Sequence, residues 1–263
     1  MNKTVMKENF KLKNFISKNT QKPLLAMLID PDKASQKHLK QLAGKIHDFT
    51  PDIFLVGGSV MEQSLFDETV EDLKSLFPQI PLILFPGSHY QVSSKADGIL
   101  MLSLVSGRNS DYLIGQQVLA APKIKASGME VLPTAYMLID GGSLSSANYI
   151  TQSLPIPADK PGIAAVTALA AKQMGMQFIY LDAGSGAQNS VSPQMVEAVK
   201  KETDLPVFVG GGIRNIHQMK SLVSSGADVI VIGTLFEEKL DEIKSMKEYI
   251  QNLIISGSLK SKI

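Results

Sequence analysis

The chain has 263 residues, of which 44% are hydrophobic and 19% are charged, and its formal net charge is +1. This composition excludes intrinsic disorder, and the balanced charge argues against broad, charge-driven binding to nucleic acid. The chain has no cysteine, which excludes disulfides, thiolate nucleophiles and cysteine-ligated zinc. It shows neither a signal peptide nor an apolar stretch long enough to cross a membrane, so we predict a cytoplasmic protein.

The two ends of the chain are predicted to be helical. Residues 1–22 carry six lysines and one glutamate, which is typical of the solvated face of a leading helix. Contact with an anionic membrane surface is the alternative use of these lysines. A C-terminal helix is expected at 236–263, and the chain between has no linker or low-complexity tract. We therefore expect one domain over residues 1–263.

Eight short apolar runs along the chain predict β-strands. They are hydrophobic at nearly every residue, as is typical of parallel strands that are covered on both faces. Helical patterns lie between them, at 35–48, 60–77, 163–174, 193–200 and 216–225. The expected strands are Leu24–Asp30, Ile53–Gly57, Leu82–Phe85, Gly98–Leu104, Val131–Ile139, Phe178–Asp182, Val207–Gly210 and Val229–Gly233.

This alternation predicts the α/β class and a (β/α)8 TIM barrel, with a doubly wound open sheet as the alternative. Two connections break the pattern. Residues 86–97 are too few for a helix between the third and fourth strands, so we expect a barrel modified around its third helix. Residues 140–160 form a long loop rich in Ser, Gly and Pro, at the end of the barrel where substrates bind.

Glycine-rich turns follow the seventh and eighth strands, in VFVGGGIRN and ADVIVIGTLFEE. Glycine lets backbone N–H groups approach an oxyanion closely, and the loops after these two strands are the usual phosphate site of a TIM barrel. Tight turns that serve only to reverse the chain are the simpler alternative. Two such turns at the right strands indicate a ligand that carries a phosphate.

A third glycine-rich turn, Gly184-Ser185-Gly186, follows the sixth strand directly after Asp182. Asp182 either caps this turn or faces a ligand hydroxyl beside the phosphate site. Tyr180 lies two residues earlier, so its side chain points to the same side of the strand. It either joins the site or fills the barrel interior.

Acidic side chains end the first strand, where Asp30 at the tip is followed by Asp32. Carboxylates there suit Mg²⁺, which takes one or two carboxylates together with phosphate oxygens. Asp32 or Ser35 can instead cap the following helix. The second strand ends in Gly57-Gly58-Ser59, and a hydroxyl at Ser59 would complete a metal site with Asp30.

Six motifs in order resemble those of the geranylgeranylglyceryl phosphate synthase family, in its longer archaeal and Bacteroidetes-like branch. They are DPDK at 30–33, VGGS at 56–59, FPGS at 85–88, YLDAGSGA at 180–187, VGGGIR at 209–214 and GT at 233–234. Each motif is modest by itself, but six in register are specific. The resemblance covers nearly the whole chain, from Leu24 to Leu235.

The resemblance implies an enzyme that joins sn-glycerol 1-phosphate to a polyprenyl diphosphate, geranylgeranyl diphosphate by the family's name, in ether-lipid biosynthesis. Diphosphate would be released, Mg²⁺ would be the cofactor, and the protein would be a homo-oligomer, either a dimer or a hexamer. By motif, Asp30 and Ser59 would bind Mg²⁺. The residues that would hold glycerol 1-phosphate are Tyr180, Leu181, Asp182, Ala183, Gly184, Ser185, Gly186, Gly211, Gly212, Gly233 and Thr234.

Two residues would be catalytic by the same resemblance. Asp182 would accept the proton of the attacking hydroxyl, and the face of Tyr136, beside the prenyl pocket, would stabilise positive charge. Asp182 stands where the family usually has the longer glutamate. A phosphosugar isomerase or aldolase on the same barrel is the alternative enzyme, although no strand core carries a lysine for a Schiff base. A non-catalytic binder of phosphate ligands is the alternative outside enzymes.

Overall fold

The computed structural model describes residues 11–18, 22–47, 49–58, 63–233 and 240–255. Eight parallel strands form a closed barrel in which each strand pairs with the next along the chain and β8 pairs with β1. The TIM barrel is therefore confirmed, and the β8–β1 pairing excludes the open sheet. The strands are β1 (Leu24–Ile29), β2 (Ile53–Val56), β3 (Leu82–Leu84), β4 (Gly98–Leu104), β5 (Glu130–Leu138), β6 (Phe178–Asp182), β7 (Val207–Gly210) and β8 (Val229–Ile232).

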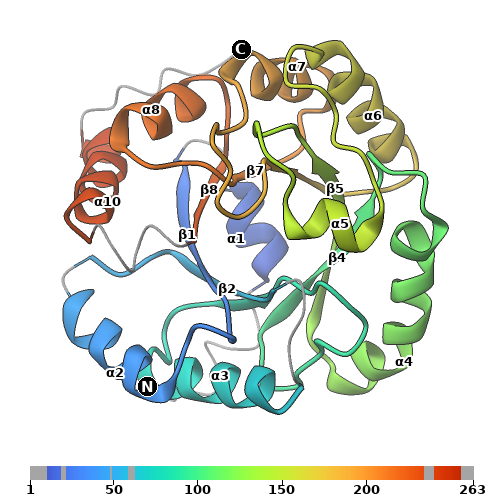
Figure 1. Ribbon diagram of the computed structural model, residues 1–263. Helices are drawn as coiled ribbons and strands as arrows, with labels where there is room; N and C mark the ends of the chain where they lie inside the picture. The colour runs from blue at the N-terminus through green and yellow to red at the C-terminus, as the bar shows by residue number, and fades with distance from the viewer. Residues whose placement is uncertain (1–10, 19–21, 48, 59–62, 234–239, 256–263) are drawn as a thin grey trace.

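Helices surround the barrel (Figure 1). The five predicted between strands are present as α2 (Gln36–Lys45), α3 (Gln63–Leu76), α6 (Pro161–Gln173), α7 (Pro193–Thr203) and α8 (Ile216–Ser224). Ser35 caps α2 by accepting the His38 N–H, which confirms one of the two predicted caps. Within the described ranges, every helix is too short or too polar to cross a lipid bilayer.

Three helical elements were not predicted from the sequence. A short π-helix, η2 (Asp111–Gly115), leads into α4 (Gln116–Ser127) between β4 and β5. Pro122 lies inside α4, and the apolar residues of this helix are spread around its circumference. The sequence therefore shows no clear helical periodicity there. The long loop at 140–160 contains the short helix α5 (Ser146–Thr151).

Both predicted terminal helices are present in part. α1 (Leu12–Lys18) lies within the span 1–22, and α10 (Leu240–Ile255) lies within 236–263. Residues 1–10, 19–21, 236–239 and 256–263 lie outside the described residues. The organisation of the whole chain as one domain stays a prediction.

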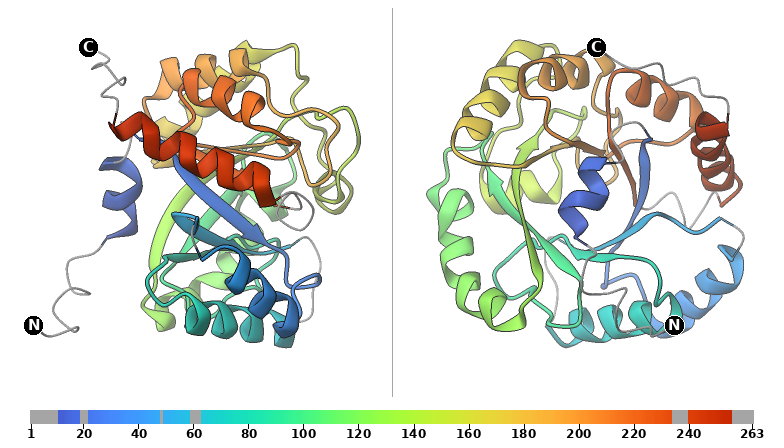
Figure 2. Two further views of the ribbon diagram at one scale, coloured as in Figure 1. Left: turned by 90° about the vertical axis from the view of Figure 1, so that its left-hand side faces the viewer. Right: turned by 180° about the vertical axis from the view of Figure 1, so that it is seen from behind.

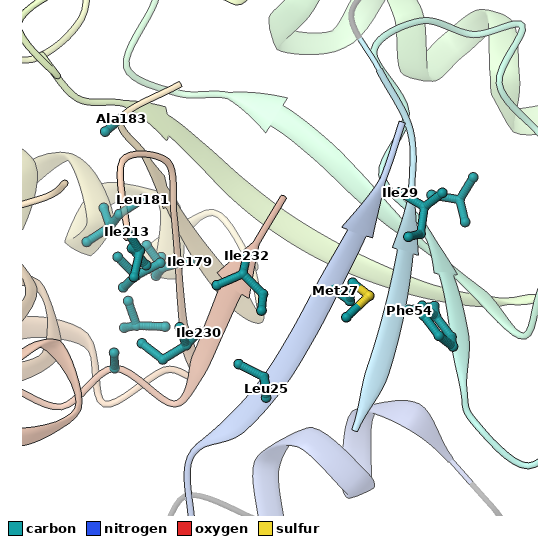
Figure 3. Close-up of a cluster of buried hydrophobic side chains, with 14 of the residues drawn as sticks. Leu25, Met27, Ile29, Phe54, Ile179, Leu181, Ala183, Ile213, Ile230 and Ile232 are labelled. Atoms are coloured by element: carbon teal, nitrogen blue, oxygen red, sulfur yellow. The ribbon is translucent and has the colours of Figure 1, made fainter. Parts of the chain in front are cut away.

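Successive side chains of each strand point alternately into the barrel interior and outward toward the helices, so the strands contribute to two apolar layers. On β1, Leu24 and Ala26 face the barrel interior, whereas Leu25, Met27 and Ile29 belong to the layer between barrel and helices. Figure 3 shows part of this outer layer, with the outward side chains of β1 and β8. Because both faces of the strands are buried, nearly every strand residue is apolar.

Helix α1 closes the N-terminal end of the barrel, as the two views of Figure 2 show. Leu12 and Ile16 are each 1% exposed and pack into the cluster inside the barrel. The N–H of Leu12 donates to Oε2 of Glu130 at 2.7 Å, and the N–H of Lys13 donates to Oε1 at 3.0 Å. A side chain at the start of β5 therefore caps a helix that lies 118 residues earlier in the chain.

Strand β4 extends past β3 toward the C-terminal end of the barrel. The last pair between them joins Leu84 to Ile99, whereas β4 pairs with β5 along its whole length. Residues 85–97, all described, contain no helix, as their number predicted. At the uncovered edge of β4, the Gln117 side chain donates to the Leu102 carbonyl. The barrel therefore has a side opening between β3 and β4.

We expect Glu130→Ala to loosen α1, because loss of a helix N-cap costs about 1 kcal/mol. Hydrogen exchange at the amides of Leu12–Lys18 should accelerate, while exchange in the strands should barely change. Glu197→Ala, at an exposed position of α7, is the control. Unchanged exchange in α1 of Glu130→Ala would show that the cap is not needed for docking.

Candidate active site

One cavity of about 520 Å³ lies at the C-terminal end of the barrel. Residues of the loops after β6, β7 and β8 line it, together with residues of the loops after β1, β2, β3 and β5. The cavity also extends through the opening between β3 and β4, because outer-layer residues line it there, namely Val92, Ile99, Met101, Ala120 and Ile124. A single cavity thus joins the polar strand ends to an apolar channel beside α4.

The loops after β6 and β7 turn through glycines with left-handed backbone. Gly184 and Gly186 have φ of 93° and 73°, and Gly211 and Gly212 have φ of 82° and 68°. A Cβ on Gly211 would lie 2.6 Å from the backbone nitrogen of Gly184, so a side chain does not fit there. At Gly233, after β8, a Cβ would meet no atom of the described residues within 4 Å. The turn after β7 is thus packed tightly against the turn after β6, whereas Gly233 has space for a methyl group among the residues that the structure describes.

Most of the residues predicted to hold glycerol 1-phosphate line this cavity. Leu181 and Ala183 belong instead to the outer apolar layer. Thr234, and Ser59 among the predicted metal ligands, lie outside the described residues. The predicted residues that line the cavity are Tyr180, Asp182, Gly184, Ser185, Gly186, Gly211, Gly212 and Gly233.

Asp182 ends β6 with its carboxylate buried beside the turns. Oδ1 accepts the Gly184 N–H at 2.7 Å, and Oδ2 accepts the Tyr136 hydroxyl at 2.6 Å. Asp182 thus caps the turn, as one of its two interpretations predicted, and it also lines the cavity. Burial raises the pKa of Asp182, while the hydrogen bonds from Tyr136 and Gly184 oppose that rise.

Aromatic rings form the wall around Asp182. Tyr136 of β5 and Tyr180 of β6 have ring centroids 5.6 Å apart, and Phe85 after β3 lies 5.8 and 4.9 Å from them. Burial, and then the charge of Asp182, raise the pKa of both tyrosines well above the usual value, so both hydroxyls stay protonated. Tyr180 is 1% exposed and also fills the barrel interior, as its alternative interpretation predicted.

Asp30, just after β1, also lines the cavity. Its Oδ1 accepts the Asp32 N–H at 3.2 Å, and its Oδ2 lies 3.6 Å from Nζ of Lys33. In the part of the chain that the structure describes, no group of three or more His, Asp or Glu side chains is placed to hold a metal ion. A metal ion at Asp30 would therefore need further oxygen ligands, such as a hydroxyl, a substrate oxygen or water.

Two basic side chains that line the cavity were not proposed as site residues from the sequence, Arg214 and His89. Arg214, after β7, donates from its guanidinium to the carbonyls of Ala187 at 2.8 Å and Gln188 at 3.2 Å. His89, after β3, has its backbone N–H and ring Nδ1 both 2.9 Å from Oε1 of Gln116. Arg214 belongs to the VGGGIR motif and was within reach of sequence reasoning, whereas no pattern marks His89.

The fold and the glycine turns are those of (β/α)8 barrels that bind phosphorylated ligands at the C-terminal ends of their strands. Comparison with known proteins defines the family. Residues 18–250 match the model of the PcrB family, and the chain belongs to that family. The resemblance carried by the six motifs is thereby confirmed.

Relatives extend over most of the chain. The geranylgeranylglyceryl phosphate synthase of Spirosoma linguale is 43% identical over 233 residues, which are 87% of this chain and 93% of that protein. The enzyme of the same name from Pyrococcus furiosus is 41% identical over 86% of this chain and 90% of that protein. The crystal structure of (S)-3-O-geranylgeranylglyceryl phosphate synthase from Thermoplasma acidophilum, in complex with substrate sn-glycerol-1-phosphate, has a TM-score of 0.86 and 32% identity. The matched region covers 92% of this chain and 99% of the Thermoplasma acidophilum chain.

We expect Tyr136→Phe to raise the pKa of Asp182, because it removes a hydrogen bond that favours the ionised carboxylate. A ¹³C NMR titration of the aspartate side chains measures this shift. When the pKa of a carboxyl group is higher in the folded state than in the unfolded state, its ionisation destabilises the folded state. The variant has the higher folded-state pKa, so its free energy of unfolding should fall further below that of the wild type as the pH rises through the pKa of Asp182.

The matched control is Tyr180→Phe, whose ring belongs to the same cluster but whose hydroxyl is not one of the two donors to Asp182. It should shift the pKa of Asp182 less. An unchanged pKa in Tyr136→Phe would argue against the hydrogen bond.

Proposed function

We propose that this protein joins sn-glycerol 1-phosphate to geranylgeranyl diphosphate, forming an ether-linked prenylglyceryl phosphate and releasing diphosphate. The observation that carries the proposal is the single cavity, in which glycine turns and a buried carboxylate lead to an apolar channel. A phosphorylated alcohol fits the first end and a long apolar chain fits the second. The names of the relatives support this reading, as does the substrate of the Thermoplasma acidophilum complex.

The phosphate of the acceptor would lie against the turns after β6, β7 and β8. Glycines at positive φ allow backbone N–H groups to face an anion at close range. Leu181 and Ala183 would support the first turn from behind, since they pack in the outer layer. Asp182, next to that turn, would accept hydrogen bonds from the glycerol hydroxyls.

Mg²⁺ would be held at Asp30 together with Ser59. The fit rests on Asp30, which offers a partly exposed carboxylate to the cavity, and on an ion that completes its shell with diphosphate oxygens and water. Bound there, Mg²⁺ would supply the positive charge that stabilises diphosphate as a leaving group. Nζ of Lys33, 3.6 Å from Asp30, adds a second positive charge at this end.

In the reaction, the primary hydroxyl of glycerol 1-phosphate attacks C1 of the prenyl chain and gives its proton to Asp182. The new C–O bond forms as the bond to diphosphate breaks, and the electron pair leaves with diphosphate. A carboxylate is a weak base, but burial raises the pKa of Asp182, and attack on a carbon with developing positive charge acidifies the hydroxyl. The faces of Tyr136 and Tyr180 would stabilise that charge.

The alternative functions lack such support. A Schiff-base aldolase needs a strand lysine in the cavity, but Lys33, the lysine that lines it in the described residues, lies in a loop and pairs with Asp30. In a non-catalytic binder of phosphate ligands, the buried Asp182–Tyr136 pair would serve only to hold the turn after β6. Homo-oligomeric assembly, a cytoplasmic location and contact with a membrane surface stay predictions.

The role of Asp182 is tested by changing its charge and its length separately. Asp182→Asn keeps an acceptor for Gly184 but cannot take a proton, so we expect kcat to fall about 100-fold or more, with a smaller rise in KM. Asp182→Glu restores the family's usual residue, and we expect a modest loss because the turn that follows consists of small residues. A near-normal kcat for Asp182→Asn would leave Asp182 as a turn cap and nothing more.

The glycerol phosphate site is tested at Gly233, where an added methyl group meets no atom of the described residues within 4 Å. Gly233→Ala should leave the unfolding temperature unchanged and raise KM for glycerol 1-phosphate about tenfold, the effect of one misplaced methyl group in a pocket. Gly211→Val is a poorer test, because its Cβ would clash with Gly184.

The control for this variant is Gly44→Ala in α2, where the methyl group also enters open space but outside the cavity. It should leave both KM values unchanged. Equal increases of KM for both substrates in Gly233→Ala would mean that the site is misplaced.

A further inference from the structure

The loops after β6 and β7 pack backbone against backbone. The Ala183 N–H donates to the Gly210 carbonyl at 3.0 Å. A Cβ on Gly212 would lie 2.5 Å from the carbonyl oxygen of Asn189. These contacts leave no room for side chains between the loops, and polar contacts at their margins add to the backbone contacts that fix their relative position.

Arg214 makes such a contact. Its Nη2 donates to the Ala187 carbonyl at 2.8 Å, and its Nη1 donates to the Gln188 carbonyl at 3.2 Å. Its own backbone N–H donates to Oε1 of Gln218, in the first turn of α8, at 2.7 Å. One residue therefore joins the loop after β6, the loop after β7 and the start of a helix.

Arg214 also brings positive charge to this wall of the cavity. The other basic side chains among the described residues that line the cavity are Lys33, after β1, and His89, after β3. The guanidinium of Arg214 instead contacts the carbonyl that directly follows Gly186 in the turn after β6. A cation beside these turns favours an anionic ligand there.

We propose that Arg214 is a positioning residue for the phosphate of the acceptor. By holding two successive carbonyls, it fixes the turn Gly184–Gly186 against Gly211–Gly212, so that N–H groups of both turns converge on one phosphate. The inference rests on the proposed function in taking the phosphate to be that of glycerol 1-phosphate. The geometry itself requires only a phosphate monoester.

The planar guanidinium is suited to this role because it presents two parallel N–H groups to two acceptors. A lysine ammonium is a point charge and does not reproduce this fork. Arg214→Lys therefore keeps the charge without the fork, and Arg214→Met removes both while it keeps an apolar stem.

The other arginine of the chain provides a matched control. Arg108 also donates from its guanidinium to two loop carbonyls, those of Val105 at 3.3 Å and Gly107 at 2.7 Å. It does not belong to the described residues that line the cavity. Arg108→Met thus removes a similar loop contact away from the proposed site.

Equilibrium binding of inorganic phosphate, glycerol 1-phosphate and geranylgeranyl diphosphate should be measured for the wild type and the three variants, together with kcat and both KM values. Arg214→Met should weaken binding of phosphate and glycerol 1-phosphate about tenfold or more, the effect of losing a charge-assisted hydrogen bond. Prenyl diphosphate binding, and kcat at saturation, should stay within about threefold. Arg214→Lys should recover part of the loss, and Arg108→Met should show none.

Several results would overturn the inference. The first is that Arg214→Met binds phosphate as tightly as the wild type does. The second is that Arg214→Lys restores the full wild-type affinity for phosphate. The third is that Arg214→Met weakens the binding of phosphate and of prenyl diphosphate equally. The lysine variant keeps the test decisive even where methionine unfolds the chain. Phosphate binding that depends on Arg214, in a protein that forms no prenylated product, would refute the proposed function and leave the role of Arg214 intact.

Discussion

The short pairing between β3 and β4 is the constraint on which the cavity depends. Backbone groups in a barrel need hydrogen-bond partners, and β4 continues beyond the last pair, Leu84 with Ile99. Gln117 donates to the Leu102 carbonyl at that uncovered edge. Since residues 85–97 form no helix, the outer layer stays open there. The cavity can therefore leave the barrel sideways, which a regular (β/α)8 barrel would prevent by packing a helix at this place.

The polar end of the cavity is held by short contacts at the strand ends. Asp182 is fixed by Tyr136 on β5 and by Gly184 in its own turn, so its carboxylate keeps one position relative to the glycine turns. Asp30, after β1, lines the same cavity. In the proposed reaction, the acceptor phosphate would lie at the glycine turns and the leaving diphosphate at Asp30, with the reacting atoms between them. Held in this way, two substrates lose little further freedom when they react.

The barrel was predictable because strands buried on both faces are apolar throughout, and because turns and charged residues mark their ends. Asp30 and Asp182 were found as candidates for the same reason, since each stands at a strand tip. Helix α4 was missed because its apolar residues gather on no single face. The partners of Asp182 and Glu130 lie 46 and 118 residues away, at Tyr136 and Leu12, and local periodicity carries no information on such contacts. Only the closed barrel brings them together.

The most direct test of the proposed activity is product identification. The purified protein should be incubated with sn-glycerol 1-phosphate, geranylgeranyl diphosphate and Mg²⁺, and the products analysed by mass spectrometry, with Asp182→Asn as the control. We expect geranylgeranylglyceryl phosphate with an ether bond, formed in equal amount with diphosphate and nearly absent in the variant. Intact substrates after prolonged incubation, or geranylgeraniol from hydrolysis without an ether product, would contradict the proposed reaction.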